Sequence, residues 1–393
     1  MIQLEEALAR ILALVHSLPA REVRLADALD CFATNDLFAG LLLPPFDNSA
    51  MDGYAVVANS CSAGARLRVV GEQPAGVDRG VAVGPGEAVR IFTGAPLPHG
   101  ADAVIMQEDV TVEDDAIVLG VAAESGEFIR QRGGDVAAGQ KILSAGDRVT
   151  PQSIALLAAQ GIGRLRVGGK VRAAMISTGD ELAAPGAALQ PGQIYDANSP
   201  LLAALLRSAG VEVAAMTHCA DRAEEIEAAI GEGLRCDVLI LTGGVSVGAR
   251  DLVKPALTAA GATLDLWRVA VKPGKPFLFG HAAGCAIFGL PGNPVSAFVT
   301  FLLFVRPALL RMMGANDAGL PLAQVSARLT EAVRNASDRP HYIRGRLNDG
   351  TFAPVGRQES HALYGLSRSN ALLLVPPNEQ FPAGASVTAL SWR

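Results

Sequence analysis

The sequence lacks paired cysteines, blocks of positive charge and a long unbroken hydrophobic run. Its five cysteines are scattered and odd in number, and none forms a CxxC pair, so neither a disulfide framework nor a structural zinc is expected. No run of lysine or arginine interrupts a chain of net charge −6, which argues against a nucleic-acid partner. The longest apolar run, 297–305, is far shorter than the roughly 20 residues of a membrane span, so no membrane attachment is expected.

The N-terminus does not have the pattern of a signal peptide. Glu5 and Glu6 occur early, while Leu4, Leu8 and Ile11 recur at helical spacing. Together with the unpaired cysteines, this predicts a cytoplasmic protein. Half of the 393 residues are apolar, which is enough for sizeable cores, and the length predicts two to four domains.

Two kinds of pattern follow one another along the chain. Residues 1–16 predict one amphipathic helix, and residues 17–150 carry short alternating runs with frequent turns, as β-structure does. From residue 170 to 314, strand-like and helix-like segments alternate, which predicts a parallel sheet with helices on both faces. Within this region we expect Asn198 and Asp221 each to cap a helix. The pattern is β again to residue 393.

A glycine-rich loop, TGGVSVG, follows an apolar strand and precedes a predicted helix. Ligands bind at the carboxyl ends of strands in open parallel sheets, where glycines let backbone N–H groups approach an anion and a helix N-terminus adds partial positive charge. A tight turn that binds nothing is the alternative. The candidate binding residues of the loop are Gly243, Gly244, Ser246 and Gly248.

A second candidate is the LPGNPVS segment. Asn293 is the expected N-cap and Pro294 the first helical residue, where the missing N–H of proline costs nothing. An anion site and a merely well-capped helix are both open, although two such ends in one sheet favour a shared ligand. The candidate binding residues here are Pro291, Gly292, Asn293, Pro294 and Ser296.

Lysines and carboxylates at turns supply further candidates. Lys272 and Lys275 flank a turn that two prolines and a glycine make rigid, which favours oxyanion binding over a solvated lysine pair. Asp52 follows a dense polar stretch, where a catalytic or metal role competes with an Asx-turn. Glu181 ends a predicted strand and Asp251 follows the glycine loop, so each is either a metal ligand or an acidic helix start.

Seven segments occur in an order and at a spacing that resemble one family, the bacterial molybdopterin molybdenumtransferases (MoeA family), which are related to the E domain of gephyrin. The resemblance extends from the first helix to about Val375. It is carried by the segments PPFDNSAMDGYA, RIFTGAPLP, STGDEL, GQIYDANSPLL, TGGVSVGARD, VKPGKPF and LPGNPVSA.

The resemblance implies a multidomain α/β plus β fold with a central molybdopterin-binding doubly wound parallel sheet (three-layer α/β/α), an interrupted helical and β N-terminal domain with a β insert, and a C-terminal β-barrel. It also implies an elongated homodimer. The implied domains are an N-terminal linker and dimer domain (1–20, 38–47, 139–170), a β-rich insert (21–37, 48–138), the molybdopterin-binding domain (171–318) and the barrel (319–393).

The implied reaction inserts molybdate into adenylyl-molybdopterin and releases AMP, with Mg²⁺ as cofactor. Small-molecule substrates are therefore expected, as are transient contacts with the molybdopterin adenylyltransferase and with downstream cofactor-processing proteins. By motif position, the resemblance implies catalytic roles for Asp52, Thr93, Asp135, Glu181, Asp221 and Asp251. Glu181, Asp221 and Asp251 would also bind the metal, and Lys272, Lys275, Arg344 and Ser360 would contact molybdate.

Some positions depart from the family pattern, namely Gly134, Arg250, Leu252 and Arg268. They leave the reaction class intact but affect which residues contact the AMP phosphate. Two rival functions are a molybdopterin adenylyltransferase, which shares the TGGVSVG sheet domain, and a non-enzymatic scaffold of the gephyrin sort. The MDGYA segment and the C-terminal β domain speak against the former. For the latter, no linker or preceding domain is expected.

Overall fold

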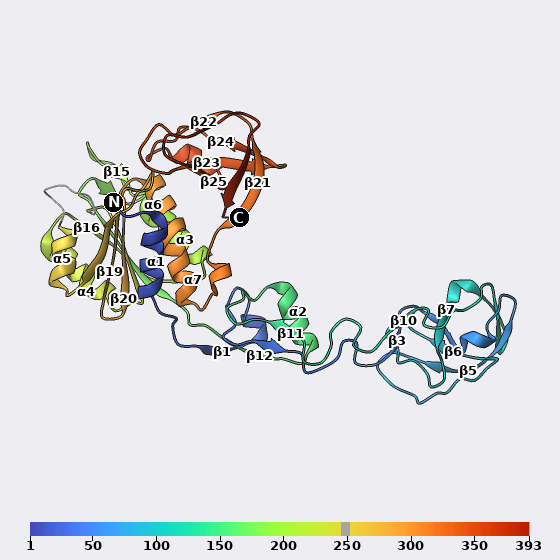
Figure 1. The fold of residues 1–393 in the computed structure, drawn as a ribbon. Helices are drawn as coiled ribbons and strands as arrows, with labels where there is room; N and C mark the ends of the chain where they lie inside the picture. The colour runs from blue at the N-terminus through green and yellow to red at the C-terminus, as the bar shows by residue number, and fades with distance from the viewer. Residues whose placement is uncertain (245–251, 393) are drawn as a thin grey trace. The chain divides into compact units, whose positions relative to one another are not determined.

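The computed structural model describes residues 1–244 and 252–392, which divide into two units that are described separately here (Figure 1). Unit 1 contains Met1–Asn35, Ala145–Ile154 and Gly163–Arg393, and unit 2 contains Asp36–Ser144 and Ala155–Ile162.

The sheet at the centre of unit 1 confirms the predicted strand–helix alternation. Its four parallel strands are β16 (Glu212–Cys219), β13 (Arg172–Thr178), β17 (Val238–Thr242) and β20 (Cys285–Leu290). The sheet continues with β19 (Pro276–Ala282) and β18 (Thr263–Arg268), which run antiparallel. This antiparallel edge was not predicted. We predicted strands from their alternation with helices, and no helix separates β19 from β20.

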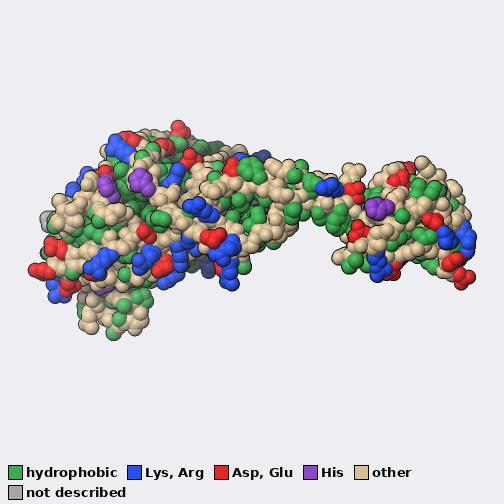
Figure 2. All heavy atoms as spheres, turned by 90° about the horizontal axis from the view of Figure 1, so that it is seen from below, with side chains coloured by type: hydrophobic (Ala, Val, Ile, Leu, Met, Phe, Trp, Pro, Cys, Tyr) green, Lys and Arg blue, Asp and Glu red, His purple; other side chains and the backbone are tan. Residues whose placement is uncertain are grey.

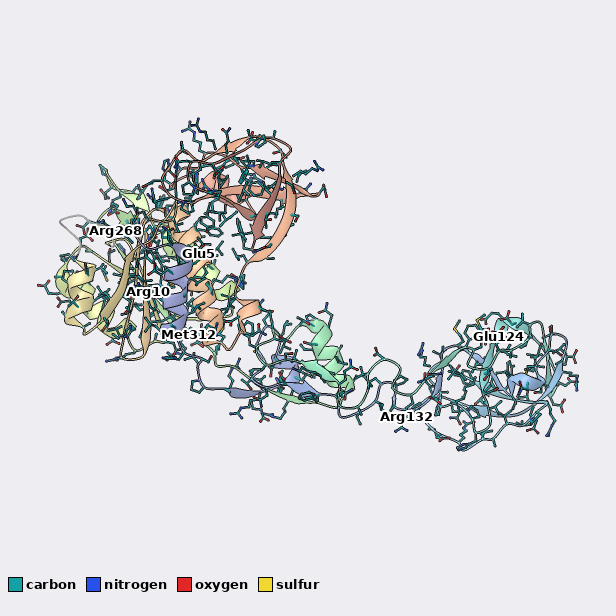
Figure 3. All side chains as sticks on the ribbon, viewed as in Figure 1. Glu5, Arg10, Glu124, Arg132, Arg268 and Met312 are labelled. Atoms are coloured by element: carbon teal, nitrogen blue, oxygen red, sulfur yellow. The ribbon has the colours of Figure 1, made fainter. Side chains whose placement is uncertain are left out.

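Helices cover both faces of this sheet (Figure 1). One face packs on α1 (Leu4–Leu14), α3 (Asn198–Ser208), α6 (Pro294–Thr300) and α7 (Arg306–Met312); Glu5, Arg10 and Met312 mark this layer in Figure 3. The other face packs on α4 (Ala223–Gly233) and α5 (Val253–Ala259). The parallel strands are buried on both faces, which is why they read as continuous apolar runs.

The longest apolar helix belongs to this core. A π-helical turn, Phe301–Val305, joins α6 to α7, so one helix extends from Pro294 to Met312. Its length and composition would be enough to cross a membrane, but 83% of its apolar window is buried inside the structure. Phe277 of β19 stacks on Phe304 of this helix with ring centroids 4.5 Å apart, which fixes the helix to the sheet.

Two predicted helix caps are wrong. Asn198 is the first residue of α3, and the carboxylate of Asp196 accepts hydrogen bonds from the backbone N–H groups of Asn198 (2.9 Å) and Ser199 (3.0 Å). The helix after Asp221 begins at Ala223, and Arg222 occupies its N-cap position. Before α3, Asp196 and Asn198 are both possible caps, and local sequence does not decide which of them reaches the free N–H groups.

The remaining part of unit 1 contains a closed barrel formed by β21 (Ala323–Leu329), β24 (Thr351–Pro354), β23 (His341–Asn348), β25 (Ala371–Val375) and β27 (Ser386–Ser391). Next to it lie the short pair β22 (Val333–Arg334) and β26 (Gln380–Phe381) and the helix α8 (Leu363–Arg368). The barrel encloses its own apolar core around Phe352, Leu373 and Val375.

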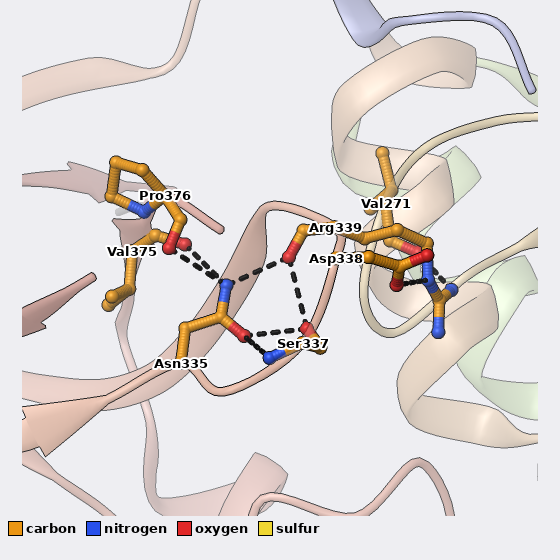
Figure 4. A network of polar contacts seen from close by, with 7 residues as sticks. All are labelled: Val271, Asn335, Ser337, Asp338, Arg339, Val375 and Pro376. Atoms are coloured by element: carbon orange, nitrogen blue, oxygen red, sulfur yellow. Dashed lines mark hydrogen bonds and ion pairs between the residues drawn. The ribbon is translucent and has the colours of Figure 1, made fainter. Parts of the chain in front are cut away.

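A network of polar contacts secures the barrel to the sheet (Figure 4). The amide group of Asn335 donates to the carbonyl oxygens of Arg339, Val375 and Pro376 at 2.8–3.0 Å. The loop that this amide holds carries Arg339, whose guanidinium donates to the Val271 carbonyl at 2.9 Å. The barrel is thereby connected to the segment that leads into the lysine turn.

One buried histidine makes the barrel sensitive to acid. His341 is 6% exposed, and neither ring nitrogen has a hydrogen-bond partner in the described structure. Burial, together with the charges of Lys272, Arg344 and Arg339, lowers the pKa of His341 from 6.5 to about 4. The unfolded chain therefore binds more protons between these two values, so stability is complete above pH 6.5 and is lost as the pH falls.

We expect the free energy of unfolding to fall by about 2 kcal/mol between pH 6.5 and pH 5 on account of His341 alone. Urea unfolding of the wild type and of His341→Leu at both pH values measures this. Carboxylates contribute to both proteins, so the prediction concerns the difference between them. Parallel loss of stability in the two proteins would contradict it.

Unit 2 is built on a six-stranded sheet. Its strands, in spatial order, are β7 (Ala103–Met106), β4 (Gly53–Val56), β6 (Glu87–Ile91), β5 (Arg66–Gln73), β9 (Ala116–Leu119) and β8 (Val110–Glu113). Two short pairs accompany it, β3 (Asn48–Ser49) with β10 (Ile129–Arg130) and β2 (Leu37–Phe38) with β11 (Lys141–Leu143); α2 (Pro151–Ala159) contributes its second half. Apolar clusters pack on both faces of the sheet.

One strand that we assigned to the β insert pairs with a strand outside it. We placed residues 21–37 in the β insert, but β1 (Arg21–Arg24) pairs with β12 (Arg164–Val167) in unit 1. The alternating pattern of β1 is the same as that of an insert strand, and only its long-range partner decides where it belongs. The other proposed domain boundaries stay predictions.

Candidate functional site

A cavity of about 440 Å³ opens where three parallel strands of the sheet end. Thr178 ends β13, Thr242 ends β17, and Pro291 follows the last residue of β20. This is the edge at which open α/β sheets bind ligands. The lining residues are Thr178, Glu181, Leu182, Ile194, Asn198, Thr242, Gly243, Gly244, Pro276, Pro291, Gly292, Asn293 and Ser296.

The two predicted anion loops line this one cavity. Gly243 and Gly244 have φ values of +84° and +59°. A Cβ on Gly243 would lie 2.4 Å from the Thr178 carbonyl oxygen, so only glycine fits there. A Cβ on Gly292 would lie 3.9 Å from the Gly243 Cα, which places the second loop directly beside the first.

The structure bears out some of these predictions and departs from others. Asn293 is the N-cap of α6 and Pro294 its first residue, as predicted, although Pro294 is not among the lining residues. Ser246, Gly248 and Asp251 lie outside the described residues. The helix after the glycine loop, α5, begins only at Val253, well beyond Gly244.

Asn198 contributes to the cavity in a way that sequence analysis missed. It is 8% exposed, and its amide nitrogen donates to the Thr242 hydroxyl at 2.9 Å and to the Gly292 carbonyl at 2.6 Å. Asn198 thus ties the ends of β17 and β20 together. Its carboxamide oxygen is buried and has no hydrogen-bond partner among the residues that the structure describes. The sequence signal for this residue was its position after the YDA segment, which we interpreted as a cap.

The predicted carboxylates are only partly brought together. Glu181 lines the cavity. Asp221 is exposed; its backbone N–H donates to the Asp180 carboxylate at 3.1 Å, and Asp221 is not a lining residue. Within residues 1–244 and 252–392, no group of three or more His, Cys, Asp or Glu side chains is arranged to hold a metal ion.

The lysine turn lies against α6. Gly274 has a φ of +125°, and a Cβ there would lie 2.6 Å from the Thr300 side chain, so glycine allows the turn to pack this closely. Lys272 is half-buried and Lys275 is exposed, and the turn leads into Pro276 of the cavity lining. Lys272 also exchanges backbone hydrogen bonds with the β23 segment of the barrel, at 2.8 and 2.9 Å.

The barrel brings one further loop to the cavity. The Ser360 hydroxyl accepts a hydrogen bond from the Asn293 amide at 2.9 Å, and the Ser360 carbonyl accepts one from the Val295 N–H at 3.1 Å. Ser360 therefore lies beside the cavity, next to its lining residue Asn293, and its contact with molybdate stays a prediction.

Arg344 does not occupy the position of a ligand contact. It is 1% exposed, and its guanidinium donates to the carbonyl oxygens of Ala362 (2.8 Å), Arg357 (2.5 Å) and Glu359 (3.2 Å). We expected Arg344 to touch molybdate, but its donors are committed to the loop that carries Ser360. Its sequence position placed Arg344 near the loop of Ser360. It could not show whether the guanidinium binds a ligand or positions that loop.

Unit 2 holds the remaining candidates. The Asp52 carboxylate accepts hydrogen bonds from the Thr93 backbone N–H (2.7 Å) and the Thr93 hydroxyl (2.8 Å), which lower the pKa of Asp52. Arg90 lies nearby, with the Tyr54 and Phe92 rings each 5.1 Å from its guanidinium. Asp135 is exposed, and its backbone N–H donates to the Leu43 carbonyl.

The Asp52 position depends on a close backbone approach. A Cβ on Gly53 would lie 1.9 Å from the Ile105 carbonyl oxygen, so β4 can pair with β7 at this register only with glycine after Asp52. The result is an exposed, ionised carboxylate at the end of a rigid strand. Asp52 and Thr93, which come from two different motifs, are thus in direct contact.

Charge around the sites is local. On the face drawn in Figure 2, acidic and basic side chains are interspersed over both units. An anionic ligand is therefore held by nearby donors rather than by the net field of a chain of charge −6. Arg268, one of the departures from the family pattern, ends β18 (Figure 3), accepts a backbone bond from Ile2, and is not a lining residue.

Family models match most of the chain in three segments. Residues 2–161 match the MoeA N-terminal region (domain I and II), residues 174–311 the "Probable molybdopterin binding domain", and residues 326–392 the MoeA C-terminal region (domain IV). The second segment contains the sheet and all lining residues of the cavity. Fold and site thus define a transferase of molybdenum-cofactor biosynthesis.

Comparison with individual proteins defines the family of the chain more specifically. It is 40% identical over 367 residues to molybdopterin molybdenumtransferase 2 of Mycobacterium tuberculosis, with 90% of each chain covered, and 36% identical to the Haemophilus influenzae molybdopterin molybdenumtransferase, with 99% and 98% covered. The crystal structure of the molybdopterin biosynthesis moeA protein from Pyrococcus horikoshii OT3 matches with a TM-score of 0.85 and 30% identity over 100% of both chains. The chain belongs to the molybdopterin molybdenumtransferase (MoeA) family.

Proposed function

We propose that the chain inserts molybdenum from molybdate into adenylyl-molybdopterin, releasing AMP and leaving the metal on the pterin dithiolene. The observation that supports this most is one cavity lined by both the glycine loop and the turn at Gly292, with Ser360 of the barrel loop hydrogen-bonded to its lining residue Asn293. A reaction that joins a nucleotide and an oxyanion needs two adjacent anion sites, and this arrangement offers them.

The two anions are assigned to neighbouring places: the pyrophosphate to the cavity, and molybdate to the lysine turn and Ser360, which adjoin the lining residues Pro276 and Asn293. The glycine loop and the turn at Gly292 take the pyrophosphate, because glycines allow a close backbone approach. Lys272, Lys275 and Ser360 take molybdate, because the ammonium groups supply charge and the hydroxyl supplies a hydrogen bond. Arg344 holds the loop of Ser360 in place.

Mg²⁺ is proposed as the cofactor, with Glu181, Asp221 and Asp251 as its ligands. Carboxylate oxygen is the donor that Mg²⁺ prefers, and Glu181 offers one inside the cavity. When bound, the ion would neutralise charge at the scissile phosphate. Catalytic roles are also proposed for Asp52, Thr93 and Asp135 of unit 2, with the Asp52 carboxylate kept ionised by its hydrogen bonds from Thr93.

We further propose that the enzyme is a cytoplasmic homodimer. It would receive its substrate in transient contact with the molybdopterin adenylyltransferase and would pass its product to downstream cofactor-processing proteins. Sedimentation at micromolar concentration tests the dimer, and a fully active monomer would exclude a site shared between two chains.

The decisive test of function is release of AMP. Incubation with adenylyl-molybdopterin and molybdate should release AMP only when molybdate is present. A molybdopterin adenylyltransferase would instead consume ATP and molybdopterin, and a scaffold would do neither. AMP release that does not respond to molybdate would overturn the proposal.

Lys275→Ala is expected to raise the molybdate concentration for half-maximal AMP release by about 10- to 150-fold, because it removes one charge-assisted contact worth about 1.5–3 kcal/mol. Affinity for adenylyl-molybdopterin should change little. Lys254→Ala, at an exposed residue of α5, is a matched control that should alter neither. A loss of nucleotide affinity with an unchanged molybdate response would assign the lysine turn to the nucleotide.

A further inference from the structure

The carboxamide of Asn198 is fixed in one orientation. One side of the group faces the Gly292 carbonyl at 2.6 Å, and a carbonyl oxygen can only accept, so the nitrogen must lie on that side. The same nitrogen reaches the Thr242 hydroxyl at 2.9 Å. The amide therefore cannot rotate to exchange its ends, and its oxygen has a determined direction.

That oxygen is a buried acceptor without a partner. Asn198 is 92% buried, lines the cavity, and its Oδ1 has no hydrogen bond in the described structure. An unpaired buried polar atom destabilises a fold by about 1–3 kcal/mol, so such atoms in native structures call for a water, an ion or a ligand. The residue that carries this atom lines the proposed substrate site.

The chemistry of the neighbouring groups narrows the choice of partner. Thr178, Thr242 and Ser296 bear hydroxyls that can donate or accept as the ligand requires, whereas Asn198 Oδ1 can only accept. A phosphate oxygen would be repelled by it. Mg²⁺ takes six ligands, mostly carboxylates, phosphates and waters, and Glu181 is the only carboxylate among the described lining residues.

We propose that Asn198 is a specificity-determining residue whose Oδ1 accepts a hydrogen bond from a neutral N–H or O–H donor of the bound substrate, beside the phosphates. The inference rests on the proposed function, because the substrate class comes from there. The donor is either a ribose hydroxyl of the nucleotide or an amino or ring N–H group of the pterin. In both cases the residue distinguishes a complete pterin nucleotide from a bare phosphate.

The test measures equilibrium binding of AMP, 6-hydroxymethylpterin and inorganic pyrophosphate by calorimetry. Asn198→Ala should weaken AMP or the pterin about tenfold, the value of one hydrogen bond, and should weaken pyrophosphate less than about twofold. If AMP is the affected ligand, dideoxy-AMP should bind wild type and variant alike. Thermal unfolding of each variant confirms that it folds.

Thr242→Val is the matched control. It removes a lining hydroxyl that is one of the two acceptors holding the Asn198 amide but leaves Oδ1 in place, so it should not weaken AMP or the pterin more than it weakens pyrophosphate. The ratio between ligands therefore separates recognition by Oδ1 from loosening of the glycine loop.

Three results would overturn the inference. Asn198→Ala could weaken pyrophosphate as much as the other ligands, which makes Asn198 a support of the loop only. It could leave all ligands unchanged, or it could weaken Mg²⁺ binding alone, which assigns Oδ1 to the ion. If the wild type itself binds neither AMP nor the pterin, the proposed function fails, and the inference fails with it.

Discussion

Replacing Asp52 with asparagine is expected to lower molybdate-dependent AMP release at least about 100-fold, the scale of one catalytic group, while unit 2 stays folded. Asparagine keeps an oxygen where the Thr93 N–H and hydroxyl donate, so the geometry survives and only the charge is lost. The measurement is AMP release at saturating substrate, together with the thermal unfolding of both proteins.

Asp115→Asn is the matched control for this change. Asp115 is also an exposed aspartate of unit 2, and it forms only a 3.8 Å ion pair with Arg66. Exposed ion pairs of this kind contribute little to the free energy of unfolding, so the variant should stay folded and its activity should stay within about twofold of the wild type. An unchanged rate in Asp52→Asn would leave Asp52 as a turn residue that accepts hydrogen bonds from Thr93.

Arg344→Met is expected to destabilise unit 1 by about 3 kcal/mol and to abolish most of the molybdate response. Three carbonyl oxygens of the loop 357–362 lose a charged donor, and each such bond is worth about 1.5–3 kcal/mol before the carbonyls recover water. Urea unfolding and the molybdate titration measure the two effects.

Arg344→Lys separates positioning from charge. Lysine keeps the positive charge but lacks the planar guanidinium that reaches three carbonyl oxygens at once. It should therefore restore little of the stability or of the molybdate response. If lysine restored the molybdate response, a charge contact with the oxyanion would be the better account of this residue. If stability were unchanged in Arg344→Met, the hydrogen bonds to the loop would not hold Ser360 in place.

Local sequence patterns were sufficient to predict those parts of the structure that depend on nearby residues. The apolar runs of β13, β17 and β20, the helix start at Pro294 and the glycines at 243 and 244 all follow from periodicity or from backbone requirements at a turn. The same patterns located the cavity, because parallel strands that end in turn residues must end at one edge of the sheet.

Local patterns failed where a residue had more than one possible partner. Asp196 rather than Asn198 caps α3, and β1 pairs with a strand about 140 residues away rather than with the insert. In both cases the side chains or strands that competed had similar local propensities. Only packing against distant segments selected one of them.

The sequence by itself determined the family, the alternation of strands and helices, and the three loops that meet at the cavity, because motifs and apolar periodicity are properties of neighbouring residues. Tertiary structure alone decided the roles of Arg344 and Asn198. Arg344 is surrounded by carbonyl oxygens that a distant loop brings to it, and Asn198 is fixed by Gly292, which lies 94 residues away along the chain. A hydrogen-bonding group acquires its role from the partners that folding places around it, and those partners are not adjacent in the sequence.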